Sequence, residues 1–309
     1  MKIITKTKIV GIGGSGCNAI LRMKKSKMRG VELIAINTDD QDLKKTKADF
    51  KIRIGKNITQ GLGTGMNPEI GKKAAQENKN EIQEILKDSD MVFITCGLGG
   101  GTGSGASPVV AEIAKNFGIL TIAIVTKPFS FEGTHRRKIA DNAEKLLKGK
   151  VDSLIIIEND KLLESLDPEV SISTAFWTCD DILRQAVQGI TDLIFLPGII
   201  NVDFADIRSI MKNSGTALFG TGIASGENRA IEAVKKAINS PLLNVSCKGA
   251  KGVLFNVSGG DDLSLSEIDE VAKLITQEIN PQAKVIFGAL KDKNLKEGEI
   301  KVNVIAAGF

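Results

Sequence analysis

The chain has 309 residues, of which 42% are hydrophobic and 25% are charged, as is typical of a globular protein with a sizeable core. The formal net charge is +4 with both signs interspersed, which does not demand a nucleic-acid partner, and none is expected. Aromatic residues make up 4% without any tyrosine, which argues against stacking platforms for single-stranded nucleic acid. Apolar runs stay shorter than about 18 residues, so direct membrane insertion is not expected.

The cysteines Cys17, Cys96, Cys179 and Cys247 lie far apart, and His135 is the single histidine. These spacings do not fit a zinc site, so no protein-bound structural metal is expected. We expect free thiols in a reducing cytosol. The N-terminal sequence MKIITKTKIVGIGG enters a strand-like run and lacks a signal pattern, which also predicts a cytoplasmic protein.

The first half of the chain alternates β-branched apolar runs with helical segments. Strands are predicted at Thr7–Gly13, Leu33–Thr38, Met91–Gly97, Leu120–Val125 and Ser153–Asn159. Helices are predicted near residues 16–29, 69–87, 105–117 and 133–148. The strands are almost continuously hydrophobic, as parallel strands covered on both faces are. The pattern predicts an open, mostly parallel α/β sheet whose ligand binds at the carboxyl ends of the strands.

A long helix is predicted from Ser171 to Phe195, because apolar residues recur there at three- and four-residue spacing. Pro197 and Gly198 end it. The sequence beyond mixes strands and helices, with a capping box at Ser264 and Glu267. We therefore predict three parts: a first domain over residues 1–170, a connecting helix over 171–196 and a smaller α+β domain over 197–309.

Three segments are rich in glycine. GIGGSGCNA (11–19) and GLGGGTGSGASP (97–108) each follow a strand and open a helix, and GLGTG (61–65) lies between them. Such loops let backbone amides approach phosphate groups at a helix N-terminus. The first alone could be a tight turn or mark a dinucleotide-binding oxidoreductase. Three of them favour a nucleoside triphosphate, and without a G-x-x-x-x-G-K-[ST] motif we expect amides, helix dipoles and Mg²⁺ to hold it.

Several motifs together resemble the tubulin/FtsZ superfamily of GTPases, and its FtsZ branch in particular. They are GIGGSGCNA, AINTDDQDL, GLGTGMNPEIGKKAA, GGGTGSG, TKPFSFEG, LRQAVQGITDLI and NVDFADIRSIM. The resemblance runs from about Lys8 to Phe309 and implies the tubulin/FtsZ fold, with GTP bound in the first domain and an activation domain at the end. It further implies a GTPase that self-assembles into filaments at the division site of bacterial cells.

The sequence departs from this branch in places. Ser104 stands where these proteins usually carry threonine, and the net charge is positive where theirs tends to be acidic. The linker and C-terminal peptide that recruit membrane tethers in the family do not appear here. Cell-division adaptor proteins remain candidate partners, and the sequence does not identify one.

The resemblance places the phosphates on backbone amides of the outer two glycine segments and the γ-phosphate at the middle one. The expected contacts are Gly13, Gly14, Ser15, Gly16, Cys17, Asn18, Thr64, Gly65, Gly99, Gly100, Gly101, Thr102, Gly103 and Ser104. Asn37 and Thr38 end a predicted strand, close to where a ribose would lie. A loop that senses a γ-phosphate is a natural switch.

The remaining nucleotide contacts also come from the resemblance. Glu132 is expected at the ribose and Arg136 at the phosphates, although their spacing alone fits a surface i,i+4 ion pair. Phe176, Asp180 and Asn159 match the family's guanine contacts, while spacing alone would put Phe176 in the core. A carboxylate can accept from N1–H and the 2-amino group of guanine, and adenine lacks that pair of donors.

No residue of the glycine segments is an obvious group for positioning the attacking water. Asp203 and Asp206 share a face at a helix start, where Asp203 could simply cap the helix. In the family, the loop that contains the motif NVDFADIRSIM enters the nucleotide site of the next subunit. The resemblance therefore implies catalytic roles for Asn201, Asp203 and Asp206. Such head-to-tail contacts generate filaments. The alternative is a nucleotide-gated cytoskeletal polymer whose hydrolysis is incidental.

Overall fold

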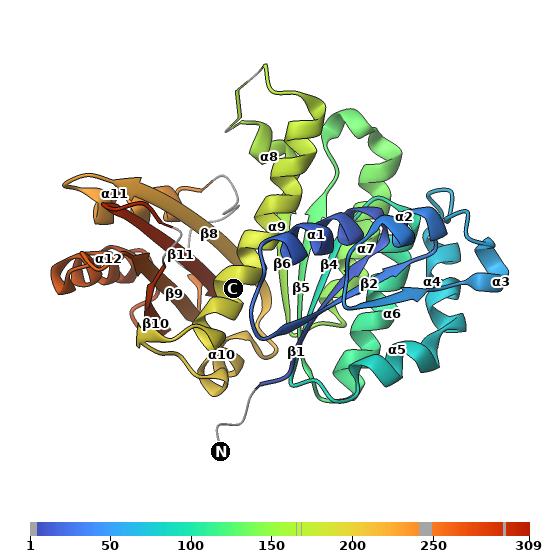
Figure 1. The fold of residues 1–309 in the computed structure, drawn as a ribbon, viewed down its shortest axis with the longest axis horizontal. Coiled ribbons are helices and arrows are strands. Elements are labelled where there is room, and N and C mark those ends of the chain that lie inside the picture. Colours follow the sequence, from blue (N-terminus) through green and yellow to red (C-terminus); the bar gives the residue numbers. More distant parts are fainter. Residues whose placement is uncertain (1–4, 165, 168, 241–248, 293–294) are drawn as a thin grey trace. The chain divides into compact units, whose positions relative to one another are not determined.

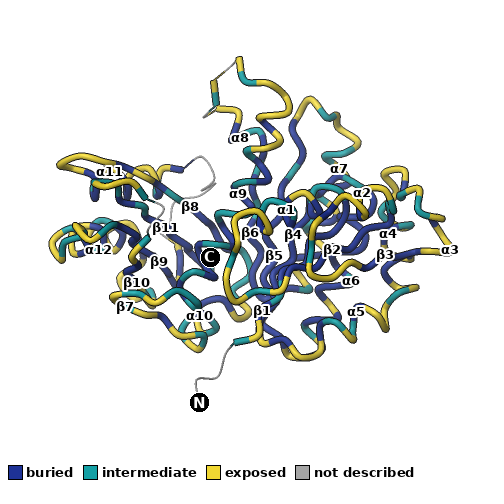
Figure 2. The backbone as a smooth tube through the Cα atoms, viewed as in Figure 1, coloured by how far each residue is buried: buried dark blue, intermediate teal, exposed yellow. Residues whose placement is uncertain are grey.

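The computed structural model describes residues 5–164, 166–167, 169–240, 249–292 and 295–309. The chain divides into two compact units, Met1–Val187 and Gln188–Phe309, and the division falls inside the long helix α9 (Ile172–Phe195). Each unit has a core of its own, built from buried strands and the helices that cover them (Figure 2). The two units are described separately below.

The first unit contains a parallel sheet with the strand order β3-β2-β1-β4-β5-β6. Its strands are β1 (Thr7–Ile12), β2 (Val31–Asn37), β3 (Phe50–Arg53), β4 (Met91–Gly97), β5 (Leu120–Lys127) and β6 (Ser153–Glu158). Its helices are α1 (Gly13–Lys25), α2 (Asp40–Lys45), α3 (Lys56–Thr59), α4 (Pro68–Glu77), α5 (Lys79–Leu86), α6 (Gly101–Asn116), η1 (Ser130–Glu132), α7 (Thr134–Lys148) and α8 (Asn159–Leu163).

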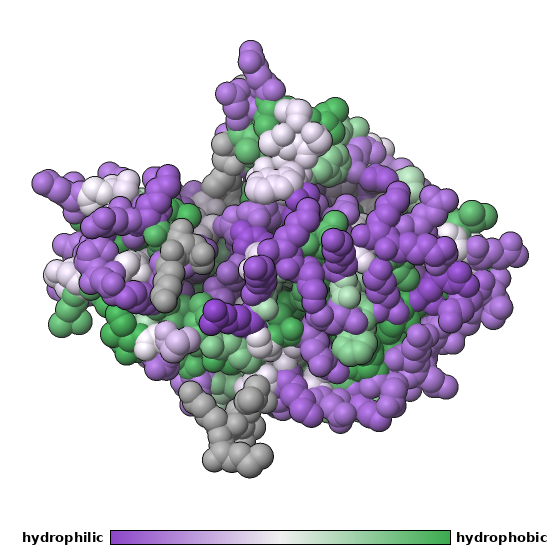
Figure 3. All heavy atoms as spheres, in the orientation of Figure 1, coloured by the Kyte–Doolittle hydropathy of each residue, from purple (hydrophilic) through white to green (hydrophobic). Residues whose placement is uncertain are grey.

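Helices cover both faces of this sheet (Figure 1). Helices α4 to α7 pack on one face, where Ala74 and Ile82 join a core with Ile94 of β4. Helix α1 lies on the opposite face, where Cys17 packs with Ala35 and with Leu43 of α2. The surface over α1 and α2 is largely hydrophilic (Figure 3). The central strands are therefore buried on both sides, which explains their continuous apolar runs.

The helices of this unit differ from the predicted ones in several places, and the short helices α2, α3 and α8 were not predicted. Helices α1 and α6 begin at Gly13 and Gly101, so glycines expected in loops form the first helical turns. The single helix predicted over 69–87 is wrong, because Asn78 separates α4 from α5. The Asn78 side chain accepts a hydrogen bond from the backbone N–H of Gly55, 2.9 Å away, and this tertiary contact fixes the break.

The second unit contains a mixed sheet with the order β8-β11-β9-β10-β7, in which only β9 and β10 pair in parallel among the described strands. Its strands are β7 (Gly198–Ile200), β8 (Gly215–Ser225), β9 (Gly252–Gly259), β10 (Lys284–Lys291) and β11 (Glu299–Ala307). Its helices are α10 (Phe204–Met211), α11 (Arg229–Ile238) and α12 (Leu265–Gln277), and α11 and α12 share one core with the sheet. The predicted fold class is confirmed: a mostly parallel α/β part, a long helix and a smaller α+β part.

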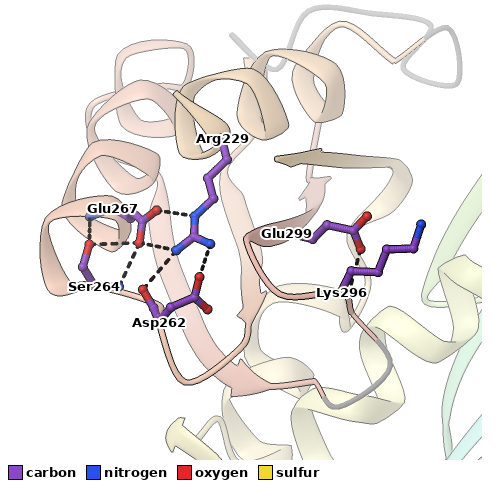
Figure 4. A network of polar contacts seen from close by, with 6 residues as sticks. All are labelled: Arg229, Asp262, Ser264, Glu267, Lys296 and Glu299. Atoms are coloured by element: carbon purple, nitrogen blue, oxygen red, sulfur yellow. Dashed lines mark hydrogen bonds and ion pairs between the residues drawn. The ribbon is translucent and has the colours of Figure 1, made fainter. Parts of the chain in front are cut away.

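An ion-pair network joins α11 to the start of α12 (Figure 4). Arg229, 7% exposed, donates from Nε to Glu267 Oε1 at 2.6 Å and from Nη2 to Glu267 Oε2 at 3.1 Å. It also pairs with Asp262. Ser264 and Glu267 form the predicted capping box. The hydrogen bonds from Arg229 lower the pKa of Glu267 to about 2, so this carboxylate is charged throughout the neutral range.

Candidate nucleotide site

A cavity of about 420 Å³ opens in the first unit at the carboxyl ends of its central strands, a volume within the usual range for small-molecule sites. Of the predicted contacts, it is lined by Gly13, Gly14, Ser15, Asn18, Thr64, Gly100, Gly101, Thr102, Gly103, Glu132, Arg136, Asn159, Phe176 and Asp180. It is also lined by residues that were not among the predicted contacts: Ile12, Gly97, Leu98, Thr126, Pro128 and Cys179.

Two helix N-termini meet at this cavity. Helices α1 and α6 follow β1 and β4, which are hydrogen-bonded neighbours in the sheet. Neither N-cap residue, Ile12 or Gly100, makes a side-chain cap, and neither first turn carries an acidic residue. The first N–H groups of both helices therefore stay available, and both positive dipole ends favour a negatively charged ligand.

The glycines allow the walls of the cavity to approach one another. Gly13 has a φ of 73°, which other residues rarely adopt, and a Cβ there would lie 3.0 Å from the backbone nitrogen of Gly103. A Cβ on Gly101 would lie 2.2 Å from Thr64 Oγ1. The Thr102 hydroxyl oxygen lies 2.7 Å from that of Thr38 and 3.4 Å from that of Thr64. Thr102 thus links the end of β2 to the middle glycine segment.

Several predicted contacts lie outside the cavity lining: Gly16, Cys17, Asn37, Thr38, Gly65, Gly99 and Ser104. Ser104 Oγ accepts a hydrogen bond of 2.9 Å from the backbone N–H of Gly99, and so fixes the conformation within the glycine segment 97–108. Asn37 Oδ1 accepts from the backbone N–H of Thr38 at 2.9 Å and shapes the end of β2. Direct contact of these residues with a nucleotide stays a prediction.

Another part of the cavity lining combines an aromatic ring with polar groups. Phe176 is 40% exposed and packs edge-on against Phe129, with ring centroids 5.3 Å apart, so it forms part of the wall and not of the core. Asn159 Oδ1 is buried without a hydrogen-bond partner in the described part of the chain. Such an acceptor is costly to leave unpaired, and an N–H group of a ligand would satisfy it.

Asp180 is paired with an arginine that the sequence analysis missed. Arg22 of α1 donates from Nε and Nη2 to Asp180 Oδ2, at 3.2 and 3.1 Å. Burial raises the pKa of Asp180 to about 6, although Arg22 opposes the shift. Arg22 could have been found from helical spacing, because it follows the predicted contact Asn18 by four residues on α1. Burial also raises the pKa of the neighbouring Cys179 thiol to about 12, which keeps it neutral.

Glu132 and Arg136 form the i,i+4 ion pair that their spacing allows, and both line the cavity. Glu132 Oε1 also accepts from the backbone N–H of Phe129 at 2.9 Å. Both expectations therefore hold: the two residues form a local i,i+4 ion pair, and they place charged groups in the cavity lining.

Comparison with known proteins assigns the family. Residues 6–167 match the Tubulin/FtsZ family, GTPase domain, and residues 215–309 match the FtsZ family, C-terminal domain. An empty FtsZ dimer from M. jannaschii is 48% identical, covers 98% of this chain and 88% of its own, and superposes with a TM-score of 0.94. A point mutant of the same FtsZ is also 48% identical, over 98% of this chain and 91% of its own, with a TM-score of 0.95. The chain belongs to the FtsZ family.

This membership confirms the predicted family and activity: the chain is a GTPase of the tubulin-like cytoskeletal filaments of cell division, and it binds GTP and GDP. CetZ2 from Haloferax volcanii, in a GTPγS-bound protofilament, shares the FtsZ fold with a TM-score of 0.83. It is 19% identical over 98% of this chain and 92% of its own.

The predicted catalytic residues of this FtsZ chain lie in the second unit. Asn201 Oδ1 accepts from the backbone N–H of Gly198 at 2.8 Å. Asp203 caps α10, since its Oδ1 accepts from the backbone N–H of Asp206 at 2.8 Å. The capping alternative is therefore realised, and it uses one oxygen of Asp203. Roles for these residues in catalysis stay a prediction.

Among the described residues, no group of three or more His, Cys, Asp and Glu side chains is arranged to hold a metal ion. Cys17, Cys96 and Cys179 are free and buried, and Cys247 lies outside the described residues. Of the helices in the described ranges, none has the length and apolar character needed to cross a membrane.

Proposed function

We propose that this FtsZ chain binds GTP in the cavity of its first unit and hydrolyses it within head-to-tail filaments. The observation that carries the proposal is the pair of uncapped helix N-termini, those of α1 and α6, side by side on one cavity. Their amides would hold the α- and β-phosphates, and Thr64 and Gly65 would meet the γ-phosphate. Loss of that phosphate would release the segment and weaken the filament contact.

The base would occupy the other end of the cavity. Asp180 would accept from N1–H and the 2-amino group of guanine, and Phe176 would contact its ring. The unpaired Oδ1 of Asn159 supports this placement, because it offers one more acceptor to a base or ribose donor. Glu132 would contact the ribose, and Arg136 would neutralise phosphate charge.

Mg²⁺ would accompany the triphosphate. The described lining offers the hydroxyls of Ser15, Thr64, Thr102 and Thr126, while its carboxylates, Glu132 and Asp180, are both paired with arginines. These few oxygen donors fit an ion held mainly by phosphate oxygens and water, as Mg²⁺ prefers. Bound there, it would supply charge neutralisation for phosphoryl transfer.

The group that positions the attacking water would come from the adjacent subunit. In this proposal Asn201, Asp203 and Asp206 enter the neighbour's cavity, whose own lining lacks an unpaired carboxylate among the described residues. The dimer of M. jannaschii FtsZ and the protofilament of CetZ2 support self-association in this fold. A heterologous contact of this kind repeats into an open filament.

The test measures GTP and ATP turnover against protein concentration, with light scattering recorded alongside. Turnover per subunit should be selective for GTP and should rise above a threshold concentration. Asp206→Ala should bind GTP normally and lose about 100-fold or more in turnover above that threshold. Asp269→Ala, which removes an exposed acid from α12, should behave as the unmodified protein. Turnover that ignores concentration, or survives intact in Asp206→Ala, would overturn the proposal.

A further inference from the structure

Arg22 reaches Asp180 from a separate helix and holds one oxygen only. Both of its hydrogen bonds end on Oδ2, and within the described residues no hydrogen bond reaches Oδ1. The side chain of Asp180 is 10% exposed and lies on the cavity lining. Arg22 therefore fixes one carboxylate oxygen and leaves the other able to accept a hydrogen bond from a ligand. A planar guanidinium suits this task, because it orients a carboxylate as well as neutralising it.

We propose that Arg22 is a positioning residue that keeps Asp180 ionised and oriented, and thereby sets the preference for guanine over adenine. This inference rests on the proposed placement of the base beside Asp180. Arg22 does not touch the nucleotide in this account. It acts through the carboxylate of Asp180. Its loss should therefore change the pH dependence of nucleotide binding, and it should leave the contacts to the phosphates unchanged.

The surroundings of Asp180 explain why a neighbouring cation is needed to keep its carboxyl group ionised. Burial raises its pKa to about 6, and the neighbouring Asp181 on α9 adds repulsion. Cys179 is neutral, and across the cavity Glu132 is matched by Arg136 from the η1–α7 segment. Arg22 is the cation that the described structure places on Asp180 itself. Without it, burial and Asp181 would leave the carboxyl protonated in part at neutral pH.

Protonation would reverse what the carboxyl offers to a base. The ionised group accepts two hydrogen bonds, which matches N1–H and the 2-amino group of guanine. The neutral group carries a hydroxyl donor, which conflicts with guanine N1–H and suits the unprotonated N1 of adenine. A mismatch of buried donors costs far more than a lost contact. Control of one proton on Asp180 is therefore control of base preference.

Trp177 makes a second contact with the guanidinium group of Arg22. The guanidinium carbon lies 5.3 Å from the ring centroid of Trp177, which is 50% exposed at the surface of α9. This cation–π contact restrains the arginine so that both its donors stay on Asp180. Trp177 is the single tryptophan of the chain, so its fluorescence also reports on this corner of the cavity.

The experiment compares Arg22→Met, Arg22→Lys and the control Arg29→Met, which removes an exposed arginine outside the cavity lining. Dissociation constants for GDP and ADP are measured from pH 5.5 to 8.5. In Arg22→Met the pH below which GDP affinity falls should rise by about one unit or more, and the preference for GDP at pH 7 should fall about tenfold. Arg22→Lys should keep the midpoint of the unmodified protein, because it restores the charge. Arg29→Met should change neither property.

A second measurement does not depend on binding. The carboxyl carbon of Asp180 is titrated by NMR in the nucleotide-free protein, and Arg22→Met should raise its midpoint while Arg22→Lys should not. An unchanged midpoint in Arg22→Met overturns the inference. If the unmodified protein fails to bind GDP, the proposed function falls, while the NMR midpoint still reports on Arg22.

Discussion

Asp180 carries a charge in a place that opposes it. Its burial is the larger influence on its pKa, and the pairing with Arg22 offsets only part of the penalty. Residues kept charged at such cost are common where a protein binds ligands, because the site needs the charge more than the fold does. The same residue should therefore limit stability and provide specificity.

Asp180→Asn should stabilise the nucleotide-free protein at pH 8 by about 1–2 kcal/mol while it weakens GDP binding. A raised pKa means that the folded state gains from the protonated carboxyl below pH 3.8 and loses this gain as pH rises through about 6. The advantage of asparagine should thus be clear at pH 8 and vanish near pH 4. Urea unfolding followed by Trp177 fluorescence measures it. Equal or lower stability of the variant at pH 8 would contradict this account.

Glycines of the segment 97–108 and of α4 act in helix packing as well as at the cavity. A Cβ on Gly105 of α6 would lie 1.9 Å from the carbonyl oxygen of Pro68, and one on Gly71 of α4 would lie 2.3 Å from that of Gly101. Helices α4 and α6 thus touch through their backbones. Because α4 follows the middle glycine segment, this contact also places Thr64 at the cavity.

Gly105→Ala should force α4 away from α6, lower the free energy of unfolding by about 1–3 kcal/mol and weaken GTP binding through the displaced Thr64. Gly149→Ala is the matched control, since a Cβ there would lie 3.9 Å from the carbonyl oxygen of Leu146, and Gly149 has a φ of −80°, which alanine readily adopts. Thermal unfolding and GTP affinity are compared for the two variants. Equal stability of both would show that the backbone contact between α4 and α6 is not needed.

The link between α11 and α12 should be sensitive to acid. Glu267 has a lowered pKa, so its contribution to stability is complete above pH 4.5 and is lost as pH falls through about 2. Glu267→Gln should lower stability at pH 7 by about 1–3 kcal/mol, because Arg229 loses one of its two acidic partners. The deficit should shrink between pH 4.5 and 2. Amide exchange in α11 and α12 measures it, with the exposed Glu270→Gln as control.

The sequence predicted those helices and strands that are determined by their own residues and not by contacts with distant parts of the chain. The strands β1, β2, β4, β5 and β6 of the first unit were predictable, because burial on both faces demands continuous apolar runs. Strand β3 was not, since FKIR mixes charged and apolar residues at a sheet edge. Strand β8 was missed because glycine and threonine interrupt GTALFGTGIAS, and its pairing with distant β11 defines it. In the same way, the glycine contacts of the site follow from motifs, and helical spacing puts Arg22 on the same face of α1 as Asn18. The pairing of Arg22 with Asp180 arises only from the tertiary fold.

In the proposed filament, the cavity that binds the nucleotide belongs to one subunit, and the loop with the catalytic aspartates belongs to the next subunit. Mixing the unmodified protein with Asp206→Ala cannot test this arrangement. The total turnover of the mixture is the same whether each loop acts on the nucleotide of its own chain or on that of a neighbour. The test therefore needs a variant whose cavity binds a nucleotide other than GTP. Asp180→Asn supplies one, since an asparagine amide can donate to the 2-oxo group that xanthine carries in place of the 2-amino group of guanine.

The double variant Asp180→Asn with Asp206→Ala should bind xanthosine triphosphate and fail to hydrolyse it alone. Adding the unmodified protein with GTP should restore xanthosine triphosphate turnover in proportion to the amount added, because each unmodified neighbour brings an intact Asp206 to the altered cavity. Adding Asp206→Ala instead should restore nothing, and Asp180→Asn alone should hydrolyse xanthosine triphosphate. If the single variant is active and the unmodified protein still gives no rescue in co-assembled filaments, Asp206 acts on its own chain's nucleotide or on none.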